Sequence, residues 1–277
     1  MKKFYQLLRI NHYIKNFLVF VPLLFTSGIG NTDDLIKSFH AFLVFCILAS
    51  AIYIINDVLD LDLDKKHPKK RKSKPLASGS ISLIQAKFIF FLLIISLLFL
   101  INFNYDILDI CLFYLLINFF YTTTFKKIPY LDLFILSSNY ILRIYMGCVA
   151  LSVDLSGWMA STVFFGALFI SSLKRKQELL LFGSVSRKVL KSYSINGLNK
   201  IINISAILSV LFYSLYIILI NQTIFLTIPL VIYGVMRYIN RSKQKQFSDS
   251  PVDEIIKDKQ NILLISIWLL IIINSKI

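Results

Sequence analysis

The sequence predicts an all-α, polytopic membrane protein. The chain of 277 residues is 57% hydrophobic and has a mean hydropathy of +0.71, which is more apolar than soluble domains usually are. Leu, Ile and Phe occur in continuous runs, several of them near the roughly 20 residues that a helix needs to cross a bilayer. Backbone groups in lipid must bond within the span, and continuous runs differ from the alternation of a membrane β-barrel. A helix bundle in the membrane is therefore expected.

Nine apolar segments are the expected spans, and the first and last are short. They cover residues 16–29, 36–55, 84–102, 107–121, 131–150, 157–173, 202–220, 223–240 and 261–274. Residues 2–13 are expected to form an amphipathic helix in the membrane interface. Arg9, His12 and Lys15 interrupt the start of the chain, so we expect it to be retained and not cleaved as a signal peptide. One membrane-embedded domain, residues 1–277, is expected.

Basic residues gather in alternate loops. The formal net charge of +15 would suit nucleic-acid binding, but the cations concentrate in the N-terminal segment and in the even-numbered loops. Such cations mark the cytoplasmic side of a membrane protein, and Lys37 and Lys276 are the exceptions. We therefore expect no nucleic-acid partner, a cytoplasmic N-terminus and a C-terminus outside.

Cysteine and histidine positions give no sign of a disulfide or a metal centre. Cys46, Cys111 and Cys148 lie singly within apolar spans, and the three histidines lack metal-ligand spacing. We expect the cysteines to be small residues of the core.

The most informative segment is residues 56–79, directly after the second span. Four carboxylates fall within its first nine residues, and seven cations fall within the next ten. If the span continues as a helix, Asn56, Asp60 and Asp64 lie one turn apart on a single stripe, with Asp57 beside it. Like charges this close repel, so the stripe needs a cation or basic neighbours. Oxygen ligands of this kind suit Mg²⁺, which often binds through one or two carboxylates plus substrate phosphates.

Two features around this stripe have structural alternatives. Tyr53 lies one turn before Asp57, where it either faces the same cavity or belongs to an interfacial aromatic belt. Pro68 is expected to end the helix, so that the cations of residues 67–71, Lys70 among them, hang over the carboxylates and bind anionic groups. A pure topology signal is the alternative for these cations, and a solvated acidic helix end is the alternative for the carboxylates.

Arg143 lies inside the fifth predicted span. An arginine in the membrane is expensive and is therefore a functional candidate, and its planar fork suits phosphate. A structural pair with a buried carboxylate, such as Asp132 on the same helix, is the alternative. Further charged residues are expected at the cytoplasmic ends of the fifth and sixth spans: Lys126, Asp132, Lys174, Arg175 and Glu178. For Lys174 and Glu178, one turn apart, an ordinary surface contact is the alternative.

At this point the residues resemble a known family. Asn56-Asp57-x-x-Asp60-x-x-x-Asp64 looks like the first aspartate motif of the UbiA superfamily of intramembrane prenyltransferases, and KPLASG at 74–79 resembles the segment that follows it. Nearly the whole chain is most similar to the decaprenyl-phosphate phosphoribosyltransferase branch. That similarity is carried by HYIKN at 12–16 with the following VFVPLLFTSG, HPKKRKSKPLASG at 67–79, Tyr121 to Asp132 with Arg143 and Gly147, LKRKQEL at 173–179, and LTIPLVIYGVMRY at 226–238.

The resemblance implies a nine-helix bundle around a cytoplasm-facing polar cavity in a bacterial inner membrane. It implies Mg²⁺-dependent transfer of a 5-phosphoribosyl group from phosphoribosyl pyrophosphate to a polyprenyl phosphate, with release of pyrophosphate. By motif, the implied metal ligands are Asn56 and Asp60. The implied catalytic residues are Asp57, Asp60, Asp64, Lys126 and Arg143. The implied substrate-binding residues are Lys15, Tyr53, Lys70, Lys126, Arg143, Lys174, Arg175 and Glu178. The expected partners are these two substrates and the bilayer, with a homo-oligomer left open.

Two other functions fit parts of the sequence. A UbiA-type aromatic prenyltransferase would use a prenyl pyrophosphate donor, but its second aspartate motif is not evident, because residues 173–179 contain one acid, Glu178. This departure favours the phosphoribosyl branch. A membrane transporter or lipid-binding protein is the alternative from another class. Transport would be favoured by paired, inverted repeats with broken helices, which the sequence does not show.

Overall fold

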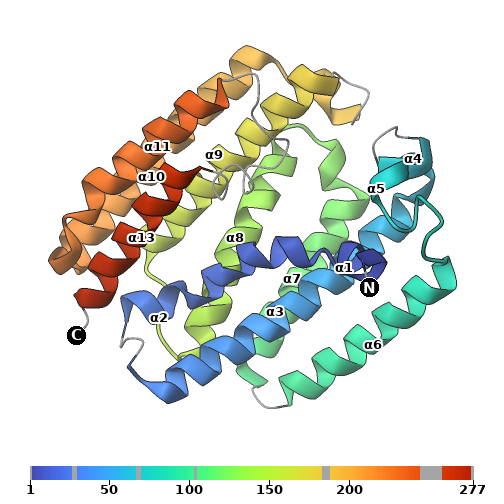
Figure 1. Ribbon diagram of the computed structural model, residues 1–277, viewed down its shortest axis with the longest axis horizontal. Coiled ribbons are helices and arrows are strands. Elements are labelled where there is room, and N and C mark those ends of the chain that lie inside the picture. Colours follow the sequence, from blue (N-terminus) through green and yellow to red (C-terminus); the bar gives the residue numbers. More distant parts are fainter. Residues whose placement is uncertain are drawn as a thin grey trace. The chain divides into compact units, whose positions relative to one another are not determined.

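The computed structural model is helical throughout the part of the chain that it describes (Figure 1). The described residues are 2–26, 30–66, 70–102, 105–182, 188–243 and 258–275. The predicted all-α class is therefore confirmed. The helices form two compact units. The first consists of Met1–Leu23, Asn31–Thr123 and Leu142–Asp154, and the second of Leu24–Gly30, Thr124–Ile141 and Leu155–Ile277. One domain over residues 1–277 stays a prediction.

The long helix α3 (Thr32–Leu59) is the centre of the first unit. It packs against several neighbours (Figure 1), namely α1 (Lys2–Leu8), η1 (Ile10–Phe20), α6 (Leu83–Ile101) and α7 (Leu108–Thr123). The other elements of this unit are α4 (Leu61–Lys66), α5 (Lys70–Ser73), η2 (Tyr105–Ile107) and the later part of α8 (Leu131–Ala150). Its core includes Phe45, which is fully buried and lies edge-on to Tyr114 with ring centroids 4.7 Å apart.

The N-terminal segment corrects two predictions. The interfacial helix predicted over 2–13 ends at Leu8, because Arg9 adopts a left-handed backbone conformation with φ of 52°. The first predicted span, 16–29, is replaced by η1 and α2 (Val21–Phe25), and residues 27–29 lie outside the described part. A left-handed residue other than glycine is strained by about 1 to 3 kcal/mol, so the contacts that Arg9 makes must offset this strain.

Gly147 allows α8 and η1 to approach each other within the first unit. A Cβ atom at this position would lie 2.0 Å from the carbonyl oxygen of Val19, closer than real Cβ contacts ever are. The obstacle is backbone, which cannot rotate away as a side chain does. A residue larger than glycine therefore requires the two helices to separate.

We expect Gly147→Ala to destabilise the protein by about 1 to 3 kcal/mol, the usual penalty for overpacking a tight interface. Thermal unfolding of the detergent-solubilised protein measures the effect. Gly234→Ala is the matched control, since a Cβ atom there meets nothing within 4 Å and alanine is the better helix former. An unfolding midpoint for Gly147→Ala equal to that of the control would contradict the close approach.

The second unit is a set of helices packed along their lengths. α9 (Gly157–Phe182) packs against α10 (Ile195–Ile220), α10 against α11 (Thr227–Ser242), and α11 against α13 (Lys259–Asn274) (Figure 1). The unit also contains η3 (Phe125–Lys127), η5 (Lys188–Ser192), η6 (Gln222–Ile224) and the first part of α8. Arg237 on α11 forms a bidentate pair with Asp258, the N-cap of α13, at 2.8 and 2.9 Å. Hydrogen bonds from this guanidinium lower the pKa of Asp258.

The observed helices agree with most of the predicted spans. α8 has the predicted bounds, 131–150, whereas α9 and α10 extend well beyond theirs. Within the described residues, five helices are long and apolar enough to cross a membrane: α3, α6, Tyr105–Thr123, α8 and α10. Ile10–Phe25 and Lys259–Asn274 are shorter apolar helices. The count of nine spans and the cytoplasm-facing cavity stay predictions.

Candidate functional site

The acidic stripe is helical, as predicted. The amide of Asp60 donates to the carbonyl oxygen of Asn56 at 2.9 Å, and the amide of Asp64 donates to that of Asp60 at 2.9 Å. Asp60 itself lies at the small break between α3 and α4. The three residues therefore follow one another at helical-turn spacing. Asp62, between them, is exposed to solvent.

Two carboxylates of the segment are buried among cations. Asp57 and Asp64 are each 2% exposed. The Nζ atom of Lys74 bridges them, 2.8 Å from Asp57 Oδ1 and 2.5 Å from Asp64 Oδ2. Arg9 Nη2 lies 2.5 Å from Asp57 Oδ1, and Lys70 Nζ lies 3.5 Å from Asp64 Oδ1. We call these five residues the carboxylate cluster.

The cations of the carboxylate cluster reduce the repulsion between neighbouring carboxylates that the sequence predicts. Buried charges are tolerated when they are paired, and here three cations neutralise two carboxylates. Asp57 and Asp64 therefore hold basic side chains in place. Asn56 and Asp60 are only half-buried, so ligands have better access to them than to the cluster carboxylates. The Thr122 hydroxyl on α7 donates to the side-chain oxygen of Asn56 and so orients this amide.

Lys70 and Arg71 are the cations of residues 67–71 that lie in the described part of the chain, and they line different sites. His67, Pro68 and Lys69 lie outside the described residues, so the predicted helix break at Pro68 does too. Lys70 does reach the carboxylate cluster. Arg71 is exposed and lines a different pocket, so the prediction that it hangs over the carboxylates is wrong. Consecutive helical residues point in different directions, which separates Arg71 from Lys70.

The N-terminal segment contacts the carboxylate cluster through Arg9 and contacts Tyr53 through Arg9 and His12. The guanidinium carbon of Arg9 lies 4.6 Å from the ring centroid of Tyr53, and the His12 ring meets Tyr53 edge-on at 5.4 Å. Tyr53 thus contacts Arg9, a member of the carboxylate cluster. Lys15, on η1, is half-buried. The substrate-binding roles of Tyr53 and Lys15 stay predictions.

Arg143 is buried in the first unit, with a side chain that is only 4% exposed. Its Nε donates to Asn16 Oδ1 at 3.0 Å, and Asn16 Nδ2 in turn lies 3.2 Å from Cys46 Sγ. The guanidinium carbon lies 5.0 Å from the ring centroid of Phe45 and 6.0 Å from that of Tyr114. These contacts orient the guanidinium through a neutral amide and two aromatic rings.

The second unit contains a buried polar network on α8, α9 and the segment after η5. Asp132 accepts a hydrogen bond from Arg175 Nη2 at 2.7 Å and another from the Tyr193 hydroxyl. Arg175 Nη1 also donates to Glu178 Oε2 at 2.6 Å. Burial, together with the nearby Asp132, raises the pKa of Tyr193, so this hydroxyl keeps its proton. Arg175 is 3% exposed and is engaged by two carboxylates; its substrate-binding role stays a prediction.

The other predicted residues have different surroundings. Lys126 on η3 and Lys174 on α9 are half-buried members of the second unit. Glu178 accepts from Arg175, three residues earlier, and its contact with Lys174 stays a prediction. Cys46, Cys111 and Cys148 are free and buried, as predicted.

Sequence reasoning missed part of this geometry. It gave no role to Lys74, the bridging cation, although the KPLASG segment contains it. It also left out Asn16, Thr122 and Tyr193, which orient other polar groups. The signal for Lys74 was its position ten residues after Asp64 in a segment already singled out by motif. Nothing local marks Thr122 or Tyr193.

Comparison with known proteins identifies the family of the chain. The model of the UbiA prenyltransferase family matches residues 18–250. A protein from Corynebacterium glutamicum named decaprenyl-phosphate phosphoribosyltransferase is 34% identical over 217 residues, which are 76% of this chain and 65% of that protein. The protein of the same name from Mycolicibacterium smegmatis is 34% identical over 216 residues, 75% of this chain and 68% of that protein. The chain thus spans about two thirds of the length of these relatives.

The fold has close counterparts among solved structures. A UbiA homolog from Archaeoglobus fulgidus bound to DMAPP and Mg²⁺ superimposes with a TM-score of 0.73 and 15% identity, covering 99% of both chains. The chain belongs to the UbiA prenyltransferase family and is a multi-pass membrane enzyme.

Proposed function

We propose that this protein transfers a 5-phosphoribosyl group from phosphoribosyl pyrophosphate to a polyprenyl phosphate of the decaprenyl type, and releases pyrophosphate. The observation that carries the proposal is the 32 to 34% identity, over about three quarters of this chain, with relatives named decaprenyl-phosphate phosphoribosyltransferase. The small number of acidic residues in 173–179 also supports this proposal. Their one carboxylate, Glu178, is paired with Arg175, which leaves no second aspartate motif for a prenyl pyrophosphate.

Magnesium is the cofactor that the site suits best. Among the described residues, no group of three or more His, Cys, Asp or Glu side chains is placed so that it could hold a metal ion. A metal at this site must therefore take some of its ligands from elsewhere. Asn56 and Asp60 offer two oxygen ligands on adjacent helical turns. Mg²⁺ commonly uses one or two carboxylates and takes its other ligands from substrate phosphates and water, so this short set fits. When bound, Mg²⁺ would neutralise charge on the departing pyrophosphate.

The chemistry asks for positioning and charge neutralisation. The bond from the ribose carbon to the pyrophosphate oxygen breaks, and a bond from that carbon to an oxygen of the lipid phosphate forms. The attacking oxygen is already an anion, so no general base is required. Lys70, Lys126 and Arg143 are proposed to bind phosphate groups, while Asp57 and Asp64 hold the basic side chains in place.

The other predicted contacts are part of the same proposal. Lys15 and Tyr53 are proposed to border the donor site, and Lys174, Arg175 and Glu178 are proposed to bind substrate. The active site and the N-terminus are proposed to face the cytoplasm of a bacterial inner membrane, with the C-terminus outside. A homo-oligomer is compatible with this arrangement.

A turnover assay tests the proposed reaction. Purified protein in detergent is incubated with Mg²⁺, phosphoribosyl pyrophosphate labelled in the ribose and a polyprenyl phosphate. We expect label in the lipid fraction and release of pyrophosphate, both abolished by EDTA. A parallel incubation with a prenyl pyrophosphate and an aromatic acceptor is expected to give no product. Product in the second incubation alone would overturn the proposal in favour of aromatic prenyl transfer.

Arg143 gives a sharper test of the phosphate contacts. We expect Arg143→Ala to raise KM for phosphoribosyl pyrophosphate by tenfold or more, because a charge-assisted contact of this kind contributes about 1.5 to 3 kcal/mol. Asn16→Ala is the matched variant: it removes the hydrogen bond that orients Arg143 but keeps the charge, so its effect on KM should be smaller. A fall in thermal stability with unchanged kinetic constants would assign Arg143 to structure alone.

A further inference from the structure

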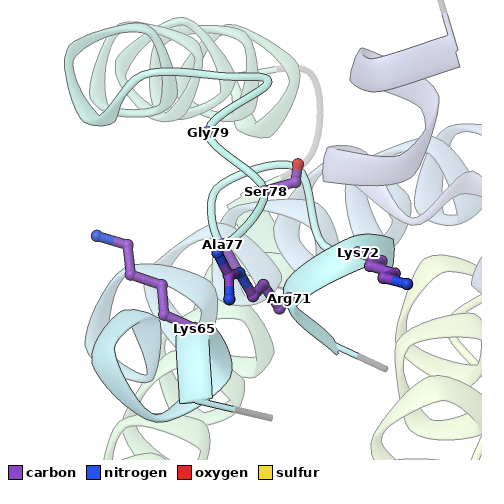
Figure 2. A pocket seen from close by; sticks show the side chains of 6 residues that line it. All are labelled: Lys65, Arg71, Lys72, Ala77, Ser78 and Gly79. Atoms are coloured by element: carbon purple, nitrogen blue, oxygen red, sulfur yellow. The ribbon is translucent and has the colours of Figure 1, made fainter. Parts of the chain in front are cut away.

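A basic pocket is formed by the end of α4, by α5 and by the turn at residues 77–79, all in the segment that follows the acidic stripe. Its volume is about 560 Å³, and it is lined by Lys65, Arg71, Lys72, Ala77, Ser78 and Gly79. Figure 2 shows Arg71 next to Ala77, at the middle of the group, with Lys65 on one side and Lys72 on the other. All six residues belong to the first unit. The pocket is therefore formed entirely within the first unit.

The basic residues of this segment are divided between two sites. Lys70 and Lys74 are joined by a helical hydrogen bond of 2.9 Å, and both turn to the buried carboxylates. Lys65, Arg71 and Lys72 are exposed, and none of them forms an ion pair with a carboxylate in the described part of the chain. Three cations without an ion pair line one pocket, and the positive potential of such a cluster attracts an anion.

The wall of the pocket is firmly held, although its cations are exposed. Leu76 and Ala77 are 4% and 8% exposed, and Leu76 packs in a core cluster with Ile54 and Ile81. The turn closes through a hydrogen bond from the Gly79 amide to the Leu76 carbonyl oxygen at 3.2 Å, with φ of +73° at Gly79. A positive φ is easy for glycine, which explains its place here. The Ser78 hydroxyl lies on the same turn and adds a polar group to the pocket.

The surroundings of the pocket are those of a membrane boundary. Helix α6 begins at Leu83, four residues after the pocket, and it is the least buried of the five long apolar helices, at 17% of its most apolar window. Ile84 and Phe88, in its first turns, are 80% and 62% exposed. Leu63, on α4 just before Lys65, is 63% exposed. Large apolar side chains this exposed on a membrane helix contact lipid tails.

We propose that this pocket binds the phosphate of an anionic phospholipid, apart from the site of group transfer. Three cations without an ion pair line the pocket, and exposed apolar side chains of α4 and α6 lie next to it. An open pocket of exposed lysines binds a free anion weakly, because water competes for every charge. A phospholipid is already confined to the membrane, so its effective concentration at the pocket is high. Juxtamembrane basic residues are known to attract anionic lipid in this way.

Binding of short-chain phospholipids tests the proposal without any turnover. The full chain in neutral detergent is titrated with dioctanoyl phosphatidylglycerol, with dioctanoyl phosphatidylcholine and with inorganic phosphate, and native mass spectrometry or microscale thermophoresis reports binding. We expect phosphatidylglycerol to bind more tightly than either of the others, and added salt to weaken it. The triple variant Lys65→Gln, Arg71→Gln, Lys72→Gln is expected to bind it on the order of 100-fold more weakly, at about fivefold for each cation removed.

A second triple variant supplies the charge-matched control. Lys191→Gln, Lys200→Gln and Lys243→Gln remove the same charge from exposed positions of the second unit. This variant is expected to bind phosphatidylglycerol as the unaltered chain does. Equal loss in both variants, no loss in the first, or inorganic phosphate binding as tightly as the phospholipid would each overturn the proposal. An unchanged unfolding midpoint for the first variant verifies that it is folded. Since the assay uses neither substrate, its outcome is independent of the proposed reaction.

Discussion

Asp60→Asn is expected to lower kcat/KM by on the order of 1,000-fold, because a metal that neutralises a leaving group contributes several kcal/mol to the transition state. Asp60 is half-buried at the junction of α3 and α4, and its backbone hydrogen bonds to Asn56 and Asp64 do not depend on the carboxylate. Asparagine keeps the size of the side chain and removes its charge. The protein is therefore expected to insert and fold normally, and to need more Mg²⁺ for any residual turnover.

Asp62→Asn is the control for this experiment. Asp62 lies two residues further along the chain and is exposed, so the substitution removes the same charge from the same segment without touching the stripe. Turnover at several Mg²⁺ concentrations distinguishes the two variants. If Asp60→Asn and Asp62→Asn showed the same activity and the same Mg²⁺ dependence, the assignment of Asp60 as a metal ligand would be wrong.

Lys74→Met is expected to give the largest loss of stability in the first unit, about 3 to 5 kcal/mol. The Nζ atom of Lys74 bridges Asp57 and Asp64, which are both 2% exposed. Methionine keeps most of the side-chain volume but removes the bridging charge. Two buried carboxylates are then left facing each other with only Arg9 and Lys70 to compensate them. Thermal unfolding in detergent measures the loss.

Two further variants show whether charge is the cause. Lys72→Met replaces an exposed lysine two residues away and is expected to leave the unfolding midpoint nearly unchanged. Adding Asp57→Asn and Asp64→Asn to Lys74→Met removes the two buried carboxylates that lost their bridging cation and leaves the partly exposed Arg9 and Lys70, so it is expected to restore part of the stability. A Lys74→Met protein as stable as Lys72→Met would show that the carboxylate cluster does not stabilise the fold.

Much of the fold could be predicted because helices in lipid are determined locally. Each span must bury its own backbone hydrogen bonds, so continuous apolar runs indicate helices almost regardless of their neighbours. The bounds of α8 illustrate this. The prediction was wrong where a single backbone conformation intervened, since the left-handed Arg9 ends α1 early and no apolar pattern reports it. α9 extends past its predicted end because charged residues, which carry no apolar signal, continue the helix as far as Phe182.

The candidate site was likewise predictable in its helical spacing but not in its ion pairs. Helical spacing alone placed Asn56, Asp60 and Asp64 one turn apart, and the hydrogen bonds along the backbone agree. Spacing does not say which acids are neutralised. That depends on Lys74 and on Arg9, which is 48 residues away from Asp57. The sequence also could not separate Lys70 from Arg71, which face different sites.

The sequence by itself therefore determined the helical class, most of the helices and the acidic stripe, because hydropathy and helical periodicity act over neighbouring residues. Only the tertiary structure decided which charges are buried in pairs and which stay exposed. It joined Thr122 to Asn56 across 66 residues and Arg143 to Asn16 across 127 residues. Such pairs form where helices pack, and packing depends on side-chain shape along whole helices, which no local pattern records.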